Sequence, residues 1–263
     1  MSASDSSKRM RNARSDLTNY VVHLTRCRYS PLFTPFEVLK EILRTGFIKP
    51  TFAPYTKKSR SGGTRPGIKG PYAAVCLTEQ PLSELIRTLE HTTRYQGYGI
   101  AYYKPLLYEM GARPVIYASE DEIGRKIPPG EKDWEEGKEI YAGGLPRHLQ
   151  YLWSKYDPTE CSAFNYKIDF TWEREWRVPF PNPRFKSEGL PVVIRNPWTA
   201  DNGFVIVSKE SEVPELHALI TEMHDAGVEW TKDVCSIVSL EKAEANLLSD
   251  TRYAKLDTWP DIH

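Results

Sequence analysis

Phe170-Thr-Trp-Glu-Arg-Glu-Trp-Arg-Val178 is the stretch that most clearly indicates the fold class. Side chains alternate between the two faces of a β-strand, so one face here would carry the aromatic rings and one arginine: Phe170, Trp172, Arg174 and Trp176. The other face would carry the remaining charges: Thr171, Glu173, Glu175 and Arg177. Like charges on one face repel, and such a pair persists where cations offset it or where a site uses it. The stretch therefore predicts a strand with a buried aromatic face and a charged site face. An edge strand with exposed ion pairs is the simpler alternative.

Short apolar runs with a strand pattern lie on both sides of this stretch, at residues 20–25, 72–78, 99–103, 111–117, 192–195, 204–207 and 235–240. Helical patterns are fewer and gather toward the two ends of the chain, at residues 34–44, after Pro81, and at 144–156, 213–226 and 241–248. This arrangement predicts an α+β fold with a mixed or antiparallel split sheet and flanking helices.

The first helix has the clearest boundaries in the sequence. Thr34 is a good N-cap, Pro35 suits the first helical position, and Glu37 stands three residues after the cap. Gly46 follows the apolar stripe and suits the left-handed position that ends many helices. We therefore expect a helix that begins after Thr34 and ends before Gly46.

Length and composition limit the class of protein. The chain has 263 residues, enough for one large domain, with 35 basic and 35 acidic side chains. A neutral chain has no global attraction to nucleic acid or to membranes. The four cysteines lack metal-binding spacing and no apolar run approaches membrane-spanning length, which predicts a cytoplasmic protein with reduced thiols and no membrane contact. Residues 1–17 are Ser-rich and basic and are predicted to form a disordered arm, and residues 18–263 a single domain.

Common catalytic signatures do not occur in the chain. It has no Walker loop, no GxGxxG, no GxSxG and no HExxH, which excludes the frequent nucleotide-binding and hydrolase classes. What remains is His23 in an otherwise apolar strand, aromatic strands, and the two acids Glu173 and Glu175. A lone strand histidine is more often a satisfied core residue than a ligand-binding one, and no metal-ligand set is expected.

Residues 50–71 form a long loop that is rich in glycine and proline. It carries a group of basic residues: Lys57, Lys58, Arg60, Arg65 and Lys69. Cations at such a loop can hold phosphates while glycines let the backbone approach, so the loop is predicted to bind a nucleic acid. A loop that is merely kept soluble by its charges is the alternative.

Two sets of motifs carry a resemblance to known families. The first is His23-Leu-Thr25 followed by the helix segment Leu39 to Ile48, which resembles the opening of DarT-type ADP-ribosyltransferases. The second set resembles abortive-infection proteins of the AbiGi type, and comprises Val75-Cys-Leu-Thr-Glu-Gln-Pro-Leu82, Tyr98-Gly-Ile-Ala-Tyr102, Pro114-Val-Ile-Tyr117 and Glu173-Arg-Glu-Trp-Arg177. The resemblance implies an ADP-ribosyltransferase-like split sheet that binds NAD.

The resemblance also implies roles for individual residues. Glu175 would be the catalytic carboxylate, and Glu173 would align or activate the acceptor. The cofactor-binding residues would be His23, Leu24, Thr25, Arg26, Tyr98, Tyr102 and Arg177. Among these, the histidine would hold the adenosine ribose, aromatic rings would enclose the nicotinamide, and a guanidinium would suit the pyrophosphate.

The sequence thus leads to the expectation of an NAD-dependent ADP-ribosyltransferase that modifies DNA or RNA in phage defence or a toxin–antitoxin system, with a cognate antitoxin or phage-sensing partner. Three alternatives stay open. One is a non-catalytic antitoxin or sensor with the same fold, and another is a transferase that modifies a protein side chain. The third is a metal-dependent nuclease that uses Glu173, Glu175 and His23.

Overall fold

The computed structural model describes residues 18–26, 33–51, 57–58, 64–65, 73–91, 96–119, 125–126, 141–142, 147–161, 167–168, 171–185, 188–195, 203–233 and 236–243. The predicted arm of residues 1–17 lies outside this part of the chain. The molecule divides into two compact units. The first unit comprises Met1–Ile48, Leu77–Leu107 and Pro191–His263, and the second comprises Lys49–Cys76 and Tyr108–Leu190.

The first unit is built on a sheet of mixed orientation. Its strands are β1 (Tyr20–Leu24), β6 (Gly99–Tyr103), β16 (Phe204–Val207) and β17 (Ser236–Ser239), joined by the end of β5 (Ala73–Thr78) in the order β17-β16-β6-β1-β5. Strand β6 runs antiparallel to both β1 and β16, whereas β17 runs parallel to β16. The α+β class with a mixed-orientation sheet and few helices is therefore confirmed.

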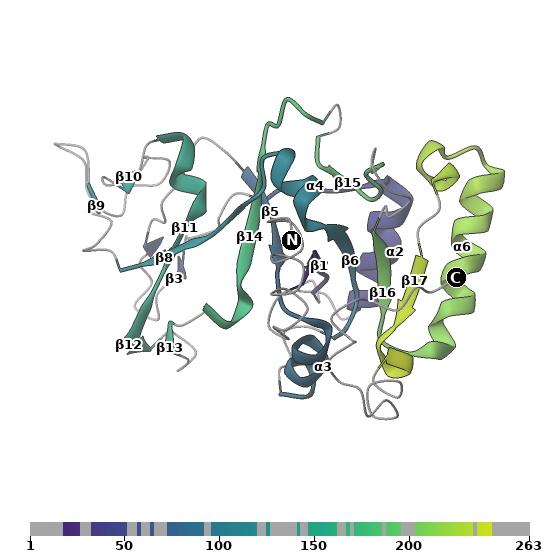
Figure 1. The fold of residues 1–263 in the computed structure, drawn as a ribbon, viewed down its shortest axis with the longest axis horizontal. Coiled ribbons are helices and arrows are strands. Elements are labelled where there is room, and N and C mark those ends of the chain that lie inside the picture. Colours follow the sequence, from purple (N-terminus) through teal and green to yellow (C-terminus); the bar gives the residue numbers. More distant parts are fainter. Residues whose placement is uncertain are drawn as a thin grey trace, which may run out of the picture. The chain divides into compact units, whose positions relative to one another are not determined.

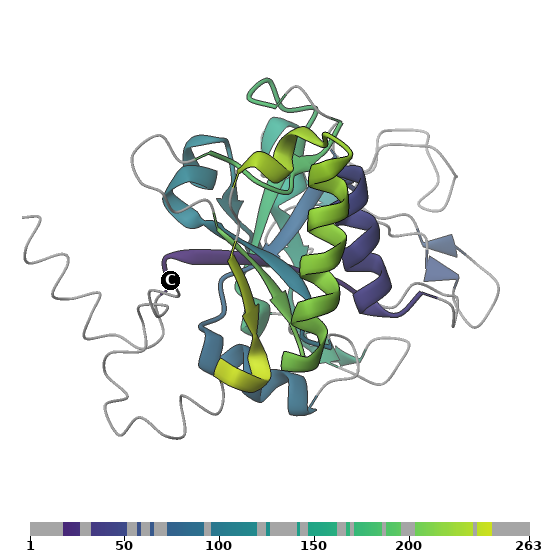
Figure 2. The same ribbon diagram turned by 90° about the vertical axis from the view of Figure 1, so that its right-hand side faces the viewer.

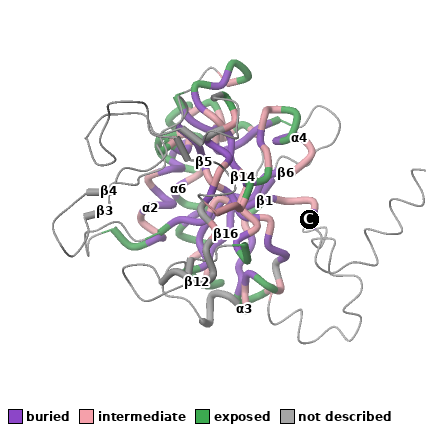
Figure 3. Tube along the Cα trace, turned by 90° about the vertical axis from the view of Figure 1, so that its left-hand side faces the viewer, coloured by how far each residue is buried: buried purple, intermediate pink, exposed green. Residues whose placement is uncertain are grey.

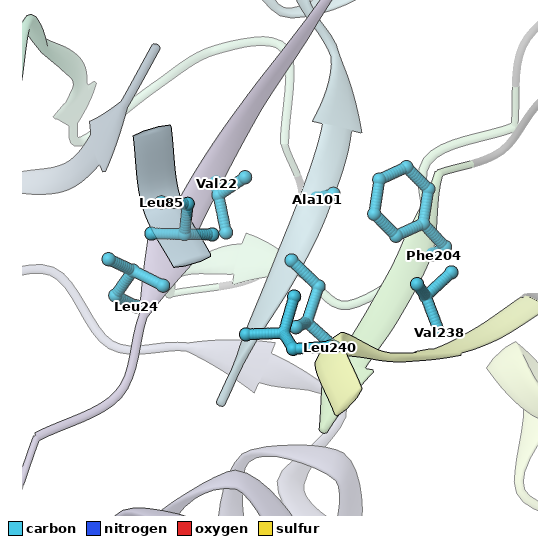
Figure 4. Packing of buried hydrophobic residues seen from close by; sticks show 8 residues of the cluster. Val22, Leu24, Leu85, Ala101, Phe204, Val238 and Leu240 are labelled. Atoms are coloured by element: carbon cyan, nitrogen blue, oxygen red, sulfur yellow. The ribbon is translucent and has the colours of Figure 1, made fainter. Parts of the chain in front are cut away.

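Apolar side chains on one face of this sheet form a core cluster with helix α3 (Leu82–His91). Its members are Val22, Leu24, Leu85, Ala101, Phe204, Ile206, Val238 and Leu240 (Figure 4). Leu85 on α3 is 1% exposed and Ile206 on β16 is fully buried. Burial of each valine, leucine, isoleucine or phenylalanine side chain contributes about 1.5–3 kcal/mol, so this cluster is a main source of the unit's stability.

Two helices lie side by side in the first unit, α2 (Pro35–Thr45) and α6 (Val213–Asp225) (Figure 2). The predicted boundaries of α2 are confirmed, because the Thr34 hydroxyl accepts from the Glu37 N–H and Gly46 has φ 78° in the left-handed region. The indole of Trp230 donates to the Leu43 carbonyl at the end of α2. Lys40 on α2 reaches Glu215 on α6, with 2.7 Å between Nζ and Oε1.

The second unit contains the remaining sheet strands in the order β5-β14-β7, where β7 is Arg113–Pro114 and β14 is Glu175–Phe180. Strands β5 and β14 are labelled in Figure 1. Strand β14 runs antiparallel to β7, with Trp176 opposite Pro114. Strand β8 (Ile116–Ala118) leaves this sheet to pair in parallel with β11 (Trp153–Lys155). Short helical turns precede two of the strands, η1 (Arg147–Leu152) before β11 and η2 (Thr171–Glu173) before β14.

The other strands are short. They are β2 (Phe47–Ile48), β3 (Lys57–Lys58), β4 (Thr64–Arg65), β9 (Arg125–Lys126), β10 (Tyr141–Ala142), β12 (Asp157–Cys161), β13 (Lys167–Ile168) and β15 (Leu190–Pro191). Strands β5, β6 and β16 are almost completely buried, and buried residues are purple in the tube of Figure 3. In the described part of the chain, no helix has both the length and the apolar character needed to cross a membrane.

Several predicted elements are wrong. The strand expected from Phe170 begins only at Glu175, because residues 171–173 form a 3-10 turn and Arg174 has φ 44°. The helix expected at 144–156 is the 3-10 turn η1 followed by strand β11, since the chain extends to pair with β8. The run at 192–195 forms no strand, although residues 192–194 are buried. The helix α4 (Lys104–Glu109) was not expected.

Candidate active site

In the second unit, the side-chain contacts that point most clearly to a site lie at the start of β14. Glu175 and Arg177 are two residues apart on this strand, so their side chains lie on the same face, as the sequence predicts. They form a two-pronged ion pair in which Nε and Nη2 of Arg177 donate to the two carboxylate oxygens of Glu175, each over 3.0 Å. The side chain of Glu175 is only 12% exposed and that of Arg177 only 7%. The carboxylate of Glu175 is therefore sheltered and fixed in orientation.

Arg177 also holds the neighbouring backbone. Its Nη1 donates to the carbonyls of Tyr151, over 2.6 Å, and of Trp153, over 2.9 Å. A guanidinium has five N–H donors, and these contacts together with Glu175 engage four of them. The arginine therefore ties η1 and β11 to β14. This geometry suits a residue that positions Glu175 better than one that reaches out to a pyrophosphate.

The backbone of Glu175 is bonded on the side of β7 and β8. Its carbonyl accepts from the Val115 N–H over 2.8 Å, and its own N–H donates to the hydroxyl oxygen of Tyr117 over 3.0 Å. Burial of the phenol, helped by the charges of Glu175 and Glu173, raises the pKa of Tyr117 to about 12. Tyr117 was not among the predicted site residues, although it ends the Pro114-Val-Ile-Tyr117 motif that carries the AbiGi-type resemblance.

Glu173 occupies a different position from the predicted one. It lies in the 3-10 turn η2 and is 8% exposed, so it does not share a continuous strand face with Glu175. The turn is closed by a hydrogen bond from the Arg174 N–H to the Thr171 carbonyl, and Arg174 follows it with φ 44°. The expected buried aromatic face is also wrong, because Trp172 is 40% exposed.

The predicted residues of the first unit gather around the end of β1. His23 is half-buried, Leu24 belongs to the core cluster, and Arg26 is exposed. The hydroxyl of Thr25 donates to the carbonyls of Pro35, over 2.8 Å, and of Tyr98, over 3.2 Å. The structure thus brings Thr25 and Tyr98 together, and Thr25 anchors the beginning of α2.

The two predicted aromatic residues are held in the interior of the first unit. The hydroxyl of Tyr98 donates to Glu212 over 2.6 Å, and that of Tyr102 donates to the Pro191 carbonyl over 2.9 Å. Burial, together with the hydrogen bond to Glu212, raises the pKa of Tyr98 above its ordinary value. Tyr102 is only 1% exposed, so its ring packs in the core and presents no open face for a nicotinamide.

The predicted acceptor-binding loop is described only in part. Lys57–Lys58 and Thr64–Arg65 form the strands β3 and β4, which pair antiparallel with Lys57 opposite Arg65. The side chains of Lys57, Lys58 and Arg65, and the whole of Arg60 and Lys69, lie outside the described part of the structure.

Two further observations concern the class of protein. Within the described ranges, no group of three or more His, Cys, Asp and Glu side chains is arranged to hold a metal ion. Comparison of the chain with protein-family models, with curated proteins and with solved structures found no match in any of the three. The function is therefore inferred from the residues and their geometry.

Proposed function

We propose that this protein is an NAD-dependent ADP-ribosyltransferase with an ADP-ribosyltransferase-like split sheet, in which Glu175 is the catalytic carboxylate. The observation that carries the proposal is the sheltered carboxylate of Glu175, fixed by the two-pronged contact with Arg177 at 3.0 Å. Cleavage of the bond between nicotinamide and ribose leaves a sugar with the character of an oxocarbenium cation. A carboxylate held beside that sugar stabilises the transition state more than the ground state.

The rigidity of the pair is what makes it suitable for catalysis. A charged group that is already oriented needs no reorganisation when charge develops on the substrate, and one such interaction is typically worth about 100-fold or more in rate. In this proposal Arg177 is a positioning residue, because its donors are engaged with Glu175 and with two backbone carbonyls.

The acceptor is proposed to be a nucleic acid, bound by the basic loop, and the biological role to be phage defence or a toxin–antitoxin effector. The basic residues at 57–58, 60, 65 and 69 and the motif resemblance support this part. Glu173, in the turn just before Glu175, is proposed to align or activate the acceptor group.

Incubation of the purified protein with NAD labelled in the adenosine moiety tests the function. We expect release of nicotinamide, and recovery of label on DNA, RNA or protein added as acceptor. A requirement for Mg²⁺ with no consumption of NAD would instead indicate a metal-dependent nuclease.

The roles of the two acids separate in the same assay. Glu173→Gln is expected to spare hydrolysis of NAD by water and to reduce transfer to the acceptor by about 10-fold or more, the lower range for loss of a general base. If Glu173→Gln lowers the rates of NAD hydrolysis and of transfer equally, the two acids act together in a single step.

One observation favours a second candidate, a non-catalytic binding protein with the same fold. The contacts of Arg177 with Tyr151 and Trp153 would also be made by an ion pair whose task is to hold strands together. Such a protein would bind its partner and leave NAD unchanged over the whole incubation.

A further inference from the structure

The hydroxyl of Tyr117 lies at an unusual position in the hydrogen-bond pattern of β14. Where β7 ends, the ladder continues for one bond, from the Val115 N–H to the Glu175 carbonyl. The next donor, the Glu175 N–H, then meets the phenolic oxygen of Tyr117 at 3.0 Å instead of a backbone carbonyl. A side chain from β8 has thus been brought to the backbone of the proposed catalytic residue.

A phenol oxygen that accepts one hydrogen bond still has its own proton to donate. Within the part of the chain that the structure describes, no group accepts the hydroxyl proton of Tyr117. The side chain as a whole is half-buried, so the protein does not enclose it completely. Since burial and the nearby carboxylates raise its pKa to about 12, the hydroxyl stays protonated at neutral pH.

A carboxylate and a phenol differ in what they offer to a ligand. Glu175 in its ionised form only accepts hydrogen bonds, whereas Tyr117 donates one. A sugar hydroxyl needs both kinds of partner, because it carries one proton and two lone pairs. A carbonyl or an ether oxygen would use the phenol alone, and an amine would use the carboxylate alone.

We propose that Tyr117 and Glu175 together bind one ribose hydroxyl of NAD, next to the bond that breaks. The hydroxyl donates its proton to the carboxylate of Glu175 and accepts the proton of Tyr117. This inference rests on the proposed function and adds to it a residue that selects ribose over deoxyribose. Its physical basis is the cost of leaving a sheltered donor or acceptor without a partner.

The test compares NAD with two analogues that lack either the 2′ or the 3′ hydroxyl of the nicotinamide ribose. The wild-type protein, the Tyr117→Phe variant and a control, Tyr108→Phe, are each assayed for binding and for kcat/KM. Tyr108 is on α4 in the same unit and is 51% exposed, so loss of its hydroxyl should change nothing.

We expect Tyr117→Phe to lower kcat/KM for NAD by about 3- to 10-fold, the usual value of one uncharged hydrogen bond. For one of the two analogues, the variant and the wild-type protein should react equally, because the hydroxyl that Tyr117 binds is already missing. If Tyr117→Phe lowers kcat/KM by the same factor for NAD and for both analogues, the inference is overturned and Tyr117 has a structural role only.

Two further outcomes are distinguishable. If the wild-type protein neither binds nor consumes NAD, the proposed function fails and this inference fails with it. If Tyr117→Phe does not fold, binding to the wild-type protein still decides: equal dissociation constants for NAD and both analogues overturn the inference, and weaker binding of one analogue supports it.

Discussion

Arg174 is the residue on which the arrangement of the two acids depends. Its φ of 44° is in the left-handed region, where a side chain with a Cβ atom is disfavoured by about 1–2 kcal/mol. This turn separates η2 from β14, so Glu173 ends one element and Glu175 begins the next. Residues in such conformations cluster at functional sites, where the surrounding structure holds them in place.

Substitution of Arg174 tests this backbone conformation. Both Arg174→Gly and Arg174→Ala remove the side chain, but only glycine avoids the steric penalty of a positive φ. We expect the glycine variant to be the more stable by about 0.5–1 kcal/mol, after allowance for the greater freedom of glycine in the unfolded chain. Denaturation in urea measures the difference.

Arg184 supplies the matched control for this comparison. It is exposed in the same unit and has no positive φ, so there the alanine variant should be the more stable. An alanine preference at both positions would contradict the left-handed conformation at residue 174.

For single residues, the sequence predicts part of the candidate site. The two-residue spacing correctly places Glu175 and Arg177 on one face, because the strand is regular from Glu175 onward. The same two-residue alternation does not hold for Glu173, because the positive φ of Arg174 interrupts the strand. The residue types give no indication of a positive φ at an arginine. Tyr117 could not be identified by spacing either, because its hydroxyl reaches Glu175 from another strand, 58 positions earlier in the chain.

Among the elements, the antiparallel pair β6–β16 depends on a close approach of two backbones. Gly203 stands just before β16 with φ 89°, and a Cβ atom there would lie 2.2 Å from the Ala101 carbonyl oxygen on β6. Gly227, after helix α6, has a similar φ of 80°, but a Cβ atom there would meet nothing within 4 Å. The two glycines therefore separate the cost of the backbone conformation from the cost of a collision.

Alanine at each glycine gives a measurable contrast. Gly227→Ala is expected to lower the free energy of unfolding by about 1–2 kcal/mol, the penalty of the left-handed conformation alone. Gly203→Ala should cost more than this by at least about 1–3 kcal/mol, because the strands must also move apart. Thermal or urea denaturation of both variants checks the order. If both variants lose the same free energy of unfolding, β6 and β16 do not approach each other as closely as described.

Elements with strong end signals were predicted well, and apolar runs without them were not. Helix α2 follows its cap residues at both ends. Residues 192–194 look like a strand because they are apolar, and they are indeed buried, but burial alone does not require a pairing partner. Helix α4 was missed although Pro105 stands at a position that the first turn of a helix tolerates.

Across the whole molecule, three of the four boundaries between the two units lie inside regular elements. They fall between Cys76 and Leu77 in β5, between Leu107 and Tyr108 in α4, and between Leu190 and Pro191 in β15, whereas the fourth follows Ile48 at the end of β2. Domain boundaries are usually recognised by exposed segments rich in proline, glycine and polar residues. A boundary inside a regular element leaves no such trace in the sequence, so sequence patterns could not reveal it.

The neutral charge of the chain makes the basic loop the main candidate for attraction to an acceptor. Replacing Lys57, Lys58, Arg60, Arg65 and Lys69 with glutamine is expected to weaken binding to nucleic acid. The dependence of binding on salt should also flatten, by roughly one unit of slope for each phosphate that the variant no longer binds. Consumption of NAD without an acceptor should not change.

The control for the loop is a variant in which five cations outside the loop, all of them exposed, are replaced with glutamine: Arg44, Arg87, Arg184, Lys209 and Lys242. It has the same net charge as the loop variant, so only contacts specific to the loop distinguish the two. If both variants modify every acceptor as well as the wild-type protein does, the loop has no part in recognition.

The assignment of Glu175 as the catalytic carboxylate is tested by Glu175→Gln. The substitution keeps the size of the side chain and removes the charge that would stabilise the ribose cation, and Glu109→Gln, an exposed change in the same unit, is the control. Nicotinamide release and NAD binding are measured on protein that thermal melting shows to be folded. We expect turnover at least ~100-fold below wild type with NAD affinity nearly unchanged, and normal activity for the control. Near-normal turnover of the folded Glu175→Gln variant would contradict the assignment.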